Sequence, residues 1–376
     1  MKQKIKVMHI ISDTNMGGAG KLLLNLSECI DKSKFEFIYT LPNNSLLHSK
    51  LEKQGRVFVF KGPGDKSFSI RSIFSLYRII KINAPDIIHT HSAFSARIAA
   101  RICGIPKSHI VYTKHCVFDC KNNISSIFRV FLNKVSDHIF TGKIIAVAEA
   151  AKHELLRMRC TPKKITVIIN GSLHQKQTTA EEKEALKKHL GISECDFVIG
   201  IIARLEEYKD HKTFLKAAQF LLEENKNFKF LLIGNGSKRE DLEKYAMELG
   251  IADHVIFTGY IEDVYRYLNI LDLNVNCSIG TETSSLSISE GLSIGIPAIV
   301  SDFGGNPNMV INGATGMVYP QKNAYELYKI IYSLKRTPNV LKKMQKNAEL
   351  DFQKRFSAKN MATQYEELYI KMLNKY

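Results

Sequence analysis

Two cationic and two acidic side chains in the second half of this chain have types and spacing that suit a charged ligand. Arg204 is followed five residues later by Lys209, and seven residues separate Glu282 from Glu290. A guanidinium grips phosphate oxygens with paired hydrogen bonds, an ammonium adds a point charge, and carboxylates accept hydrogen bonds from hydroxyl groups. These four residues therefore predict a ligand with a diphosphate at one end and hydroxyls at the other, such as a sugar nucleotide.

The two cations fall where an expected strand gives way to an expected helix. Arg204 follows a strand predicted over 197–203, and Lys209 precedes a helix predicted over 211–223. In open α/β sheets, ligands bind outside the carboxyl ends of the strands, so this position favours a binding role. The alternative is a pair of exposed loop cations that neighbouring acidic residues neutralise.

The two carboxylates belong to a loop and to the helix that follows it. Glu282 lies in the loop, and Ser285 starts a helix predicted over 285–294, whose first N–H groups could face a diphosphate. Glu290 lies inside this otherwise apolar helix, where a carboxylate needs a partner, and a ribose diol would be one. The alternative is a structural carboxylate bonded to a backbone turn.

Glycines and histidines follow the expected strands of the first half. Gly17 and Gly18 come after the first strand and open the first helix, where glycine lets backbone N–H groups approach an anion; a tight turn is the alternative. His89, His91 and His115 lie at the ends of two further strands. Histidine can carry a proton near neutral pH, although a structural histidine is the alternative for each.

Cysteine usage and apolar run lengths indicate the compartment. The seven cysteines are odd in number and scattered, which favours a reducing compartment without disulfides. Cys116, Cys120 and His115 could hold a metal ion, but no second ligand pair follows at zinc spacing. The basic, apolar start reads as a buried strand rather than a signal peptide, and no apolar run approaches the ~20 residues of a membrane span. We expect a cytoplasmic protein.

Short apolar runs alternate with amphipathic segments in two series, which is typical of parallel sheets covered on both faces. We expect an α/β fold of two Rossmann-like, doubly wound domains: 1–172, a linker region 173–195, 196–355, and a final helical segment 356–376. Strands are expected at 5–11, 35–41, 57–60, 86–89, 109–113, 144–147, 166–170, 197–203, 228–233, 255–258, 273–276 and 298–301. Helices are expected at 19–30, 46–53, 70–82, 93–103, 124–139, 180–190, 211–223, 238–249, 264–269, 285–294, 325–334, 339–352 and 358–376.

Positive charge is concentrated in the first half of the chain. The 376 residues carry a formal net charge of +16; residues 1–170 hold 27 Lys and Arg against 11 Asp and Glu, whereas 171–376 hold 26 of each kind. Such asymmetry favours an anionic partner for the first half. Nucleic acid, an anionic membrane surface and a phosphorylated acceptor are the candidates, and a solvated basic surface is the alternative.

Several motifs in a fixed order resemble the retaining GT-B glycosyltransferases of family 4. They are Ala203-Arg204-Leu205-Glu206-Glu207-Tyr208-Lys209-Asp210, Phe257-Thr258-Gly259-Tyr260, the segment 282–290, Gly304-Gly305-Asn306-Pro307 and, less specifically, Gly17-Gly18 and Thr113-Lys114-His115. The similarity spans nearly the whole chain. Departures occur at Thr283-Ser284, at Gly291 and at Asn308, and they bear on the donor sugar more than on the reaction. The portion Ser284-Ser285-Leu286-Ser287 instead resembles a Thr-Ser-rich subgroup common in polysaccharide assembly.

The resemblance implies two Rossmann-like domains facing each other across a cleft, with the last helix crossing back to the first domain. The second domain would bind a nucleotide sugar and the first much of the acceptor. Arg204 and Lys209 would hold the diphosphate, Glu290 the ribose, and Glu282 and His115 would contact the donor sugar. The implied catalytic residues are His115, Arg204, Lys209 and Glu282; the implied donor-binding residues are Gly17, Gly18, Arg204, Lys209, Gly234, Tyr260, Ser285, Leu286 and Glu290.

The reaction expected from these features moves a hexose-type sugar from a nucleoside diphosphate, UDP by expectation, to an acceptor hydroxyl with retention of configuration. The sequence has no Asp-x-Asp metal motif, so no divalent ion or other cofactor is expected beyond the donor. The basic first domain favours a glycan or lipid-linked acceptor at the inner face of an anionic membrane, in capsule, exopolysaccharide or cell-wall polymer synthesis.

Two other functions are compatible with the sequence. A sugar-nucleotide epimerase or hydrolase could use a related fold and a similar diphosphate site. A basic, non-enzymatic module could bind nucleic acid or another polyanion, but such modules interleave aromatics with cations on one surface, whereas Arg204 and Lys209 lie in the neutral half. We therefore expect no nucleic-acid partner.

Overall fold

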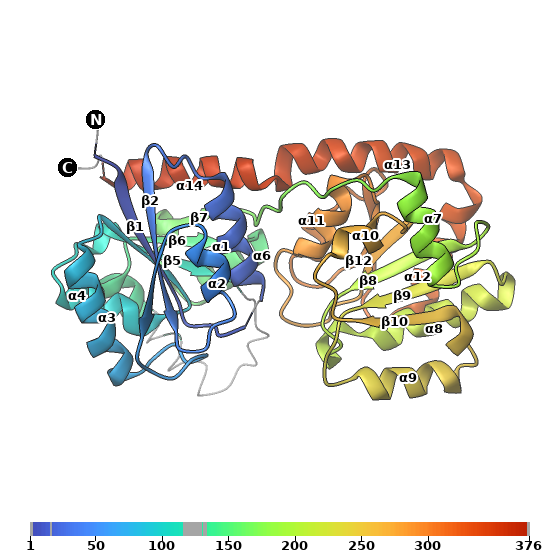
Figure 1. Ribbon diagram of the computed structural model, residues 1–376, viewed down its shortest axis with the longest axis horizontal. Coiled ribbons are helices and arrows are strands. Elements are labelled where there is room, and N and C mark those ends of the chain that lie inside the picture. Colours follow the sequence, from blue (N-terminus) through green and yellow to red (C-terminus); the bar gives the residue numbers. More distant parts are fainter. Residues whose placement is uncertain (1–2, 16, 116–129, 131–133, 374–376) are drawn as a thin grey trace. The chain divides into compact units, whose positions relative to one another are not determined.

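The computed structural model describes residues 3–373 except 16, 116–129 and 131–133 (Figure 1). The chain forms two compact units. Unit 1 comprises Met1–Gly171 together with Ala358–Tyr376, and unit 2 comprises Ser172–Ser357. Unit 1 therefore takes its last helix from the far end of the chain, and unit 2 includes the segment 173–195.

Unit 1 contains a seven-stranded sheet in the order β3-β2-β1-β4-β5-β6-β7, with every described pairing parallel. The central strands are buried along nearly their whole length, because helices cover both faces of the sheet. The strand order reverses between β1 and β4. The strands are β1 Ile5–Ile11, β2 Phe35–Pro42, β3 Arg56–Phe60, β4 Ile87–His91, β5 Ile110–Lys114, β6 Lys143–Ala146 and β7 Ile165–Val167.

Two apolar layers enclose the sheet of unit 1. One face packs against α1 and α14, whose Leu22, Leu26 and Tyr365 are buried there, and the other packs against α3 and α4, with Leu76 and Ala96 buried. The described helices are α1 Gly18–Cys29, α2 His48–Glu52, α3 Ile70–Asn83, α4 Phe94–Ile102, α6 Glu149–Arg157 and α14 Ala358–Leu373.

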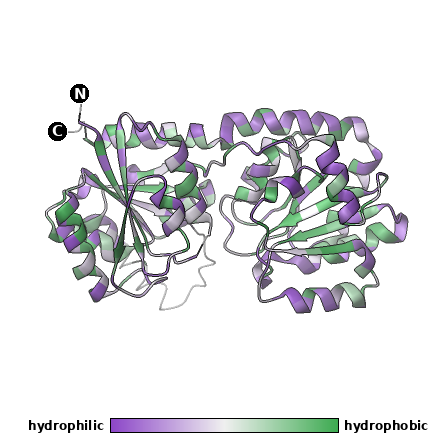
Figure 2. Cartoon of the chain, in the orientation of Figure 1, coloured by the Kyte–Doolittle hydropathy of each residue, from purple (hydrophilic) through white to green (hydrophobic). Residues whose placement is uncertain are grey.

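Unit 2 contains a six-stranded parallel sheet in the order β10-β9-β8-β11-β12-β13, which reverses between β8 and β11. The strands are β8 Phe197–Ile202, β9 Phe228–Ile233, β10 Val255–Gly259, β11 Leu273–Asn276, β12 Ala298–Ser301 and β13 Gly316–Tyr319. The helices are α7 Ala180–His189, α8 His211–Glu224, α9 Arg239–Glu248, α10 Val264–Leu268, α11 Leu286–Ser293, α12 Ala324–Arg336 and α13 Pro338–Asp351. Figure 2 shows apolar strands in both units and polar outer faces on most helices.

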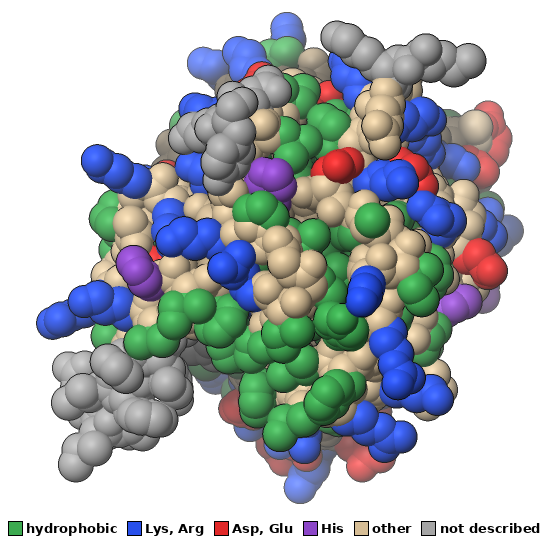
Figure 3. Space-filling view, turned by 90° about the vertical axis from the view of Figure 1, so that its left-hand side faces the viewer, with side chains coloured by type: hydrophobic (Ala, Val, Ile, Leu, Met, Phe, Trp, Pro, Cys, Tyr) green, Lys and Arg blue, Asp and Glu red, His purple; other side chains and the backbone are tan. Residues whose placement is uncertain are grey.

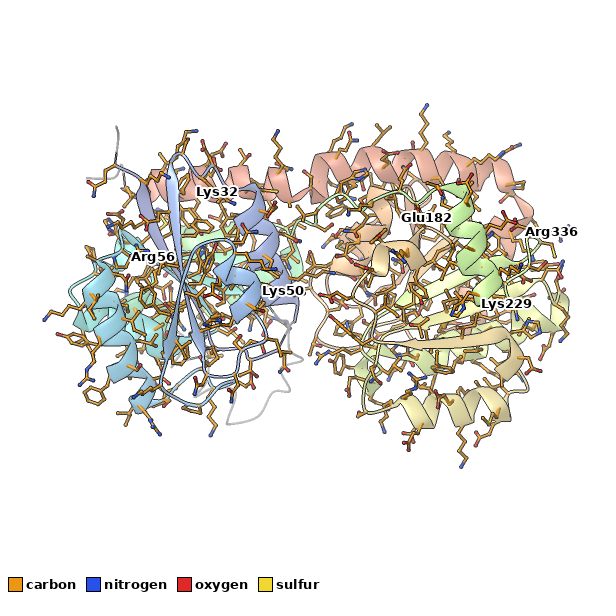
Figure 4. The ribbon with its side chains drawn as sticks, in the orientation of Figure 1. Lys32, Lys50, Arg56, Glu182, Lys229 and Arg336 are labelled. Atoms are coloured by element: carbon orange, nitrogen blue, oxygen red, sulfur yellow. The ribbon has the colours of Figure 1, made fainter. Side chains whose placement is uncertain are left out.

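The two doubly wound α/β units confirm the predicted fold class, and most predicted strands begin and end within two residues of the observed ones. The prediction missed α6 and β13. The α6 segment is short and polar, and β13 is a four-residue strand at the sheet edge, so neither has a strong periodic signal. The expected linker region 173–195 contains α7, where Glu182 (labelled in Figure 4) and Thr179 form a reciprocal capping box.

Some expectations fall partly or wholly outside the described residues. Cys116 and Cys120 are among them, and of the helix expected at 124–139 only residues 130 and 134–139 are described. Within the described parts of the chain, no helix combines the length and apolar character needed to cross a bilayer.

Candidate functional site

Three loops of unit 2 meet at the carboxyl ends of β8, β11 and β12, which are neighbours in the sheet. The loop after β11 contacts the loop after β8 through a hydrogen bond from Ile279 N to Tyr208 O, 2.9 Å long. The loop after β12 contacts the loop after β11 through Gly305 N and Glu282 O, at 3.2 Å. This edge includes the point between β8 and β11 where the strand order reverses, the usual ligand position in such sheets.

Lys209 and Glu282 form a largely buried ion pair at this edge. Lys209 Nζ lies 2.6 Å from Glu282 Oε2, and their side chains are 17% and 10% exposed. The same oxygen accepts hydrogen bonds from Ser278 Oγ at 3.0 Å and Asn276 Nδ2 at 3.3 Å. Burial raises the pKa of Glu282, but the Lys209 charge and these hydrogen bonds outweigh it and hold the pKa below its ordinary value. Glu282 is therefore an anion at neutral pH.

Arg204 and Lys209 contact the same aromatic ring, that of Tyr208. The Tyr208 ring centroid is 5.6 Å from both the Arg204 guanidinium carbon and Lys209 Nζ, so the two cations gather over one residue. The acidic residues next to them in sequence form other bonds: Glu206 accepts from Ser237, and Asp210 caps α8 through Thr213. Lys209 is paired with Glu282, from a different loop. Within the described residues, no carboxylate pairs with Arg204, which disfavours the reading of mutually neutralised loop charges.

A polar network behind the ion pair was not foreseen from the sequence. Asn276 Nδ2 bonds to Glu282 and to Ser285 Oγ, the latter at 3.1 Å, and so joins the loop carboxylate to the start of α11. Asn306 Nδ2 donates to Ser301 Oγ at 2.9 Å and to Asn276 Oδ1 at 3.3 Å. The available signal was the pair of asparagines, Asn274 and Asn276, that alternate with apolar residues in β11.

The first turns of α11 hold three of the predicted residues. Ser285 is the N-cap, but its side chain bonds to Asn276 rather than capping the helix. Leu286 and Glu290 are buried, with 9% and 3% of each residue exposed. The helix start therefore lies next to the Lys209–Glu282 pair, and Glu290 lies one turn further along.

Two glycines allow close backbone approach in these loops. A Cβ on Gly305 would lie 1.6 Å from Thr283 O, so only glycine lets the loops after β11 and β12 meet. Gly234 has a φ of +148°, and its Cβ would lie 2.0 Å from Ala203 O. Gly234, predicted as a donor-binding residue, thus has a structural role in supporting the backbone next to Arg204. Tyr260 is 69% exposed after β10, at the far edge of the sheet from β11.

His115, His91 and His9 form a hydrogen-bonded chain in unit 1, at the carboxyl ends of its central strands. His115 Nε2 lies 2.9 Å from His91 Nδ1, and His91 Nε2 lies 3.1 Å from His9 Nδ1. Burial lowers the pKa of each ring, to about 4 for His115 and well below the ordinary value for His9 and His91. The chain is therefore uncharged at neutral pH. No local pattern marked His9, which lies within the apolar run of β1, two residues before the strand ends.

The remaining histidine of this cluster contacts the C-terminal helix. His89 Nδ1 lies 2.6 Å from Tyr369 Oη of α14, and its Nε2 lies 2.6 Å from Thr113 Oγ1. Ring nitrogens of His9, His89 and His91 come within 4.8 Å of one another, close enough to share a metal ion. Five of the six ring nitrogens of these three histidines already make hydrogen bonds, and His9 Nε2 is buried without a partner among the described residues.

Gly17 and Gly18 lie at the start of α1, after β1 and at the same sheet edge as His91. Gly17 is the N-cap residue, and a Cβ there would lie 3.3 Å from Asp13 Oδ2. A Cβ on Gly18 would meet no atom within 4 Å. Gly18 is therefore not required by local packing, which leaves room for a ligand at the N-terminus of the helix.

One further histidine near the site, His211, was not predicted from the sequence. His211, the first residue of α8, is 2% exposed, and neither ring nitrogen has a hydrogen-bond partner within the described structure. Burial and the nearby Lys209 charge lower its pKa to about 4. The ring is therefore neutral and lies directly behind the Lys209 loop.

Curated relatives resemble the chain over most of its length. A galactosyltransferase of Escherichia coli, named UDP-Gal:alpha-D-GlcNAc-diphosphoundecaprenol alpha-1,3-galactosyltransferase, is 27% identical, covering 98% of each chain. The putative glycosyltransferase EpsF of Bacillus subtilis is 26% identical over 79% of each. The alpha-monoglucosyldiacylglycerol synthase of Acholeplasma laidlawii is 25% identical, over 77% of this chain and 76% of that protein.

Solved structures share the fold. Anabaena HepE in complex with UDP has a TM-score of 0.84 at 19% identity, covering 96% of this chain and 99% of that one. A glycosyltransferase from Rickettsia africae has a TM-score of 0.85 at 20% identity over the whole of both chains. Residues 16–172 match the model of Glycosyltransferase Family 4, and residues 182–351 match that of Glycosyl transferases group 1. The chain belongs to the GT-B glycosyltransferases of family 4, group 1.

Proposed function

We propose that this glycosyltransferase moves a sugar from a UDP-sugar to an acceptor hydroxyl with retention of configuration. The observation that carries this proposal is the gathering of Arg204, the Lys209–Glu282 pair and the start of α11 at the strand-order reversal of unit 2. Two cations and a helix N-terminus at one sheet edge suit a diphosphate.

Each side chain has a distinct role in the proposal. Arg204 and Lys209 bind the diphosphate, while the Glu282 carboxylate keeps the Lys209 ammonium in position and accepts a hydrogen bond from the donor sugar. Glu290 binds the ribose hydroxyls, and the exposed Tyr260 lies near the base. From unit 1, His115 contributes a hydrogen bond to the donor sugar.

The same charges account for the proposed chemistry. Negative charge develops on the leaving diphosphate as the glycosidic bond breaks, and cations already held in place stabilise that charge without reorganisation. The dipole of α11 adds to this effect. We therefore propose that transfer requires no divalent cation. The incoming hydroxyl attacks from the face of the leaving group, whose phosphate oxygen takes the proton.

The donor and acceptor classes are inferred from relatives. HepE has been solved with UDP and with UDP-glucose, and the E. coli relative uses UDP-galactose and an undecaprenol-linked acceptor by its name. The A. laidlawii relative is named for a diacylglycerol product. We propose a lipid-linked glycan acceptor in capsule, exopolysaccharide or cell-wall polymer synthesis, reached by a protein bound peripherally at the cytoplasmic face of the membrane.

A ligand panel tests the donor class directly. Ligands that bind the native state raise its melting temperature, so UDP and UDP-hexoses should stabilise the protein more than ADP, GDP or CMP. Lys209→Met should abolish the shift, whereas Lys212→Met, an exposed lysine in the same region, should keep it. No shift with any nucleotide would contradict the proposal.

Transfer itself is tested with an undecaprenyl-diphosphate-linked sugar as acceptor. UDP release should depend on the acceptor, persist in EDTA, and yield an α-linked product from an α-linked donor by proton NMR. Release without acceptor would indicate a hydrolase, and isomerisation of the donor without release would indicate an epimerase.

A further inference from the structure

Helix α3 of unit 1 presents apolar side chains to solvent. Ile70, Phe74 and Ile82 are 63%, 70% and 81% exposed. They recur at intervals of four and eight residues, which places them on one side of the helix. The opposite side, with Leu76 and Ile80, is buried in the core. The apolar exposure is thus additional to the packing that holds α3 on the sheet.

Neighbouring residues enlarge this surface. Phe68, just before α3, is 54% exposed, and Ile102, at the end of the adjacent α4, is 61% exposed; the two helices pack against each other. We call these five exposed residues the α3–α4 face. Figure 3, viewed from this side of unit 1, shows apolar side chains gathered over a continuous area with Lys and Arg side chains around it. Large exposed apolar areas with a polar rim mark interaction sites.

The charges around the α3–α4 face have one sign. The exposed basic residues in and beside it are Lys66, Arg71, Arg78, Lys81 and Arg101. Between residues 66 and 107 the sequence holds a single acidic residue, Asp86, and its carboxylate accepts a hydrogen bond from the backbone N of Lys6 at 2.8 Å. The face therefore suits a partner that is apolar within and anionic at its surface.

A hollow at the end of α4 is also lined by basic and apolar residues. It has a volume of about 530 Å³ and is lined by Arg101, Lys107 and Lys164 together with the apolar Pro106 and Ile139. The Lys164 ammonium is already paired with Asp137 at 3.0 Å, which leaves Arg101 and Lys107 as the cations available to an anion. Arg101 directly precedes Ile102 in the chain, so the hollow could receive a lipid phosphate close to the apolar face.

We propose that the α3–α4 face docks on an anionic lipid bilayer. Phe68, Phe74 and Ile82 insert among the headgroups and upper acyl chains, while Arg71, Arg78 and Lys81 lie at the lipid phosphates. A second copy of the chain is a poorer partner, because it would bring the same positive rim into contact. This docking deepens the proposed function, on which it rests for its purpose, since a lipid-linked acceptor is delivered from such a surface.

Vesicle flotation with the full-length protein tests the docking. The protein should float with vesicles of phosphatidylcholine plus phosphatidylglycerol, and less with phosphatidylcholine alone. Phe74→Glu should lower the partition coefficient about tenfold, and the double variant Arg78→Glu/Lys81→Glu about 20-fold or more, since each basic residue near the surface contributes about fivefold. High salt should weaken binding of the wild type.

Matched changes elsewhere serve as controls. Met247 on α9 of unit 2 is 68% exposed, so Met247→Glu adds the same charge at an equally exposed apolar residue. Lys342→Glu/Lys343→Glu on α13 reverses two exposed cations. Both should float as the wild type does. Equal losses in the control variants, absence of vesicle binding by the wild type, or a Phe74-dependent dimer that does not bind vesicles would each overturn the proposal.

The outcome is separable from that of the proposed function. UDP-dependent thermal stabilisation reports on unit 2 and should be unchanged in Phe74→Glu, which also shows that the variant is folded. Vesicle binding without nucleotide binding would retain the docking surface and remove the donor assignment. Nucleotide binding without vesicle binding would retain the donor assignment and remove the docking surface.

Discussion

The histidine chain of unit 1 and the Lys209–Glu282 cluster of unit 2 occupy equivalent positions, at the carboxyl ends of central parallel strands next to a reversal of strand order. Both are buried, yet the first is neutral and the second is charged. Burial disfavours charge in both places. In unit 1 the buried imidazoles are neutral, so no charge is desolvated. In unit 2 the charges of Lys209 and Glu282 persist because they pair with each other and Glu282 accepts further hydrogen bonds.

The difference in charge between the two sheet edges determines which ligand group each can bind. A neutral imidazole chain can accept or donate a hydrogen bond to an uncharged ligand group without repelling an anion or attracting water. A buried ion pair with an adjacent exposed Arg204 holds positive charge ready for a diphosphate. Breaking such a pair by removing one partner leaves the other charge uncompensated, at a cost of about 3–5 kcal/mol.

Removing the cation of the pair should have the largest effect. Lys209→Met leaves Glu282 buried without its partner and removes a diphosphate ligand, so kcat/KM should fall by about 10³-fold or more, and the melting temperature should drop. Steady-state kinetics and calorimetry measure both. Adding Glu282→Gln should restore much of the lost stability but not the activity; a double variant less stable than Lys209→Met alone would contradict the buried ion pair.

Acid should affect the histidine chain next. Because the pKa of each ring is lowered, the unfolded state takes up protons more readily as the pH falls below about 6.5. The contribution of the neutral rings to stability is therefore fully present above that pH and is lost as the pH falls toward about 4, the pKa of His115. The shift of the His115 pKa alone corresponds to about 3 kcal/mol of unfolding free energy. Urea unfolding from pH 7 to 4.5 measures this loss. His91→Gln should flatten it, and an unchanged slope would contradict a neutral, buried His91.

The lowered pKa of Glu282 has a different pH window. Its contribution to stability is present above the ordinary carboxyl pKa and is lost only as the pH falls through the lower, folded value. Glu282 should therefore stay ionised across the range in which the histidines titrate. Carboxyl signals followed by NMR in a ¹³C-Glu sample would distinguish the two regions, with Glu282→Gln used to assign the resonance.

A smaller effect is expected from changing the shape of the exposed cation. Arg204→Lys keeps the charge but loses the planar fork that binds two phosphate oxygens at once. The KM for the donor should rise about tenfold, corresponding to roughly 1.4 kcal/mol, with little change in melting temperature. Arg239→Lys, at a guanidinium already paired with Glu243 on α9, is the control. Unaltered donor affinity in Arg204→Lys would remove Arg204 from the diphosphate site.

The smallest effect concerns the aromatic ring that both cations share. Tyr208→Leu removes two cation–π contacts, each worth about 0.5–1 kcal/mol at exposed positions. Donor affinity should fall about fivefold while kcat stays nearly constant. Tyr245→Leu, whose ring lies 5.8 Å from Lys212 Nζ, should leave donor affinity unchanged. A large drop in kcat would instead assign Tyr208 a part in the chemical step.

Local sequence patterns predicted most strands and helices, and the elements they did not predict have identifiable physical reasons. Segments 228–233 and 273–276 predicted β9 and β11 at their observed bounds, because the first is apolar except for Lys229 and the second alternates apolar residues with asparagine. Strand β13 escaped notice because it has four residues at a sheet edge. His9 and Asn276 lie in strands that read as core, so only their neighbours on adjacent strands reveal a polar network.

The amino-acid sequence by itself determined the two βα series, the excess of positive charge in the first half, and the set of cationic and acidic residues at strand ends. Only the tertiary structure decided the strand order, the pairing of Lys209 with Glu282, and the chain from His115 to His9. The physical reason is that strand and helix periodicity is local in the chain, whereas ion pairs and ring contacts join residues 73 and 82 positions apart. Such contacts depend on which strands become neighbours, and on glycines such as Gly305 that let two loops touch.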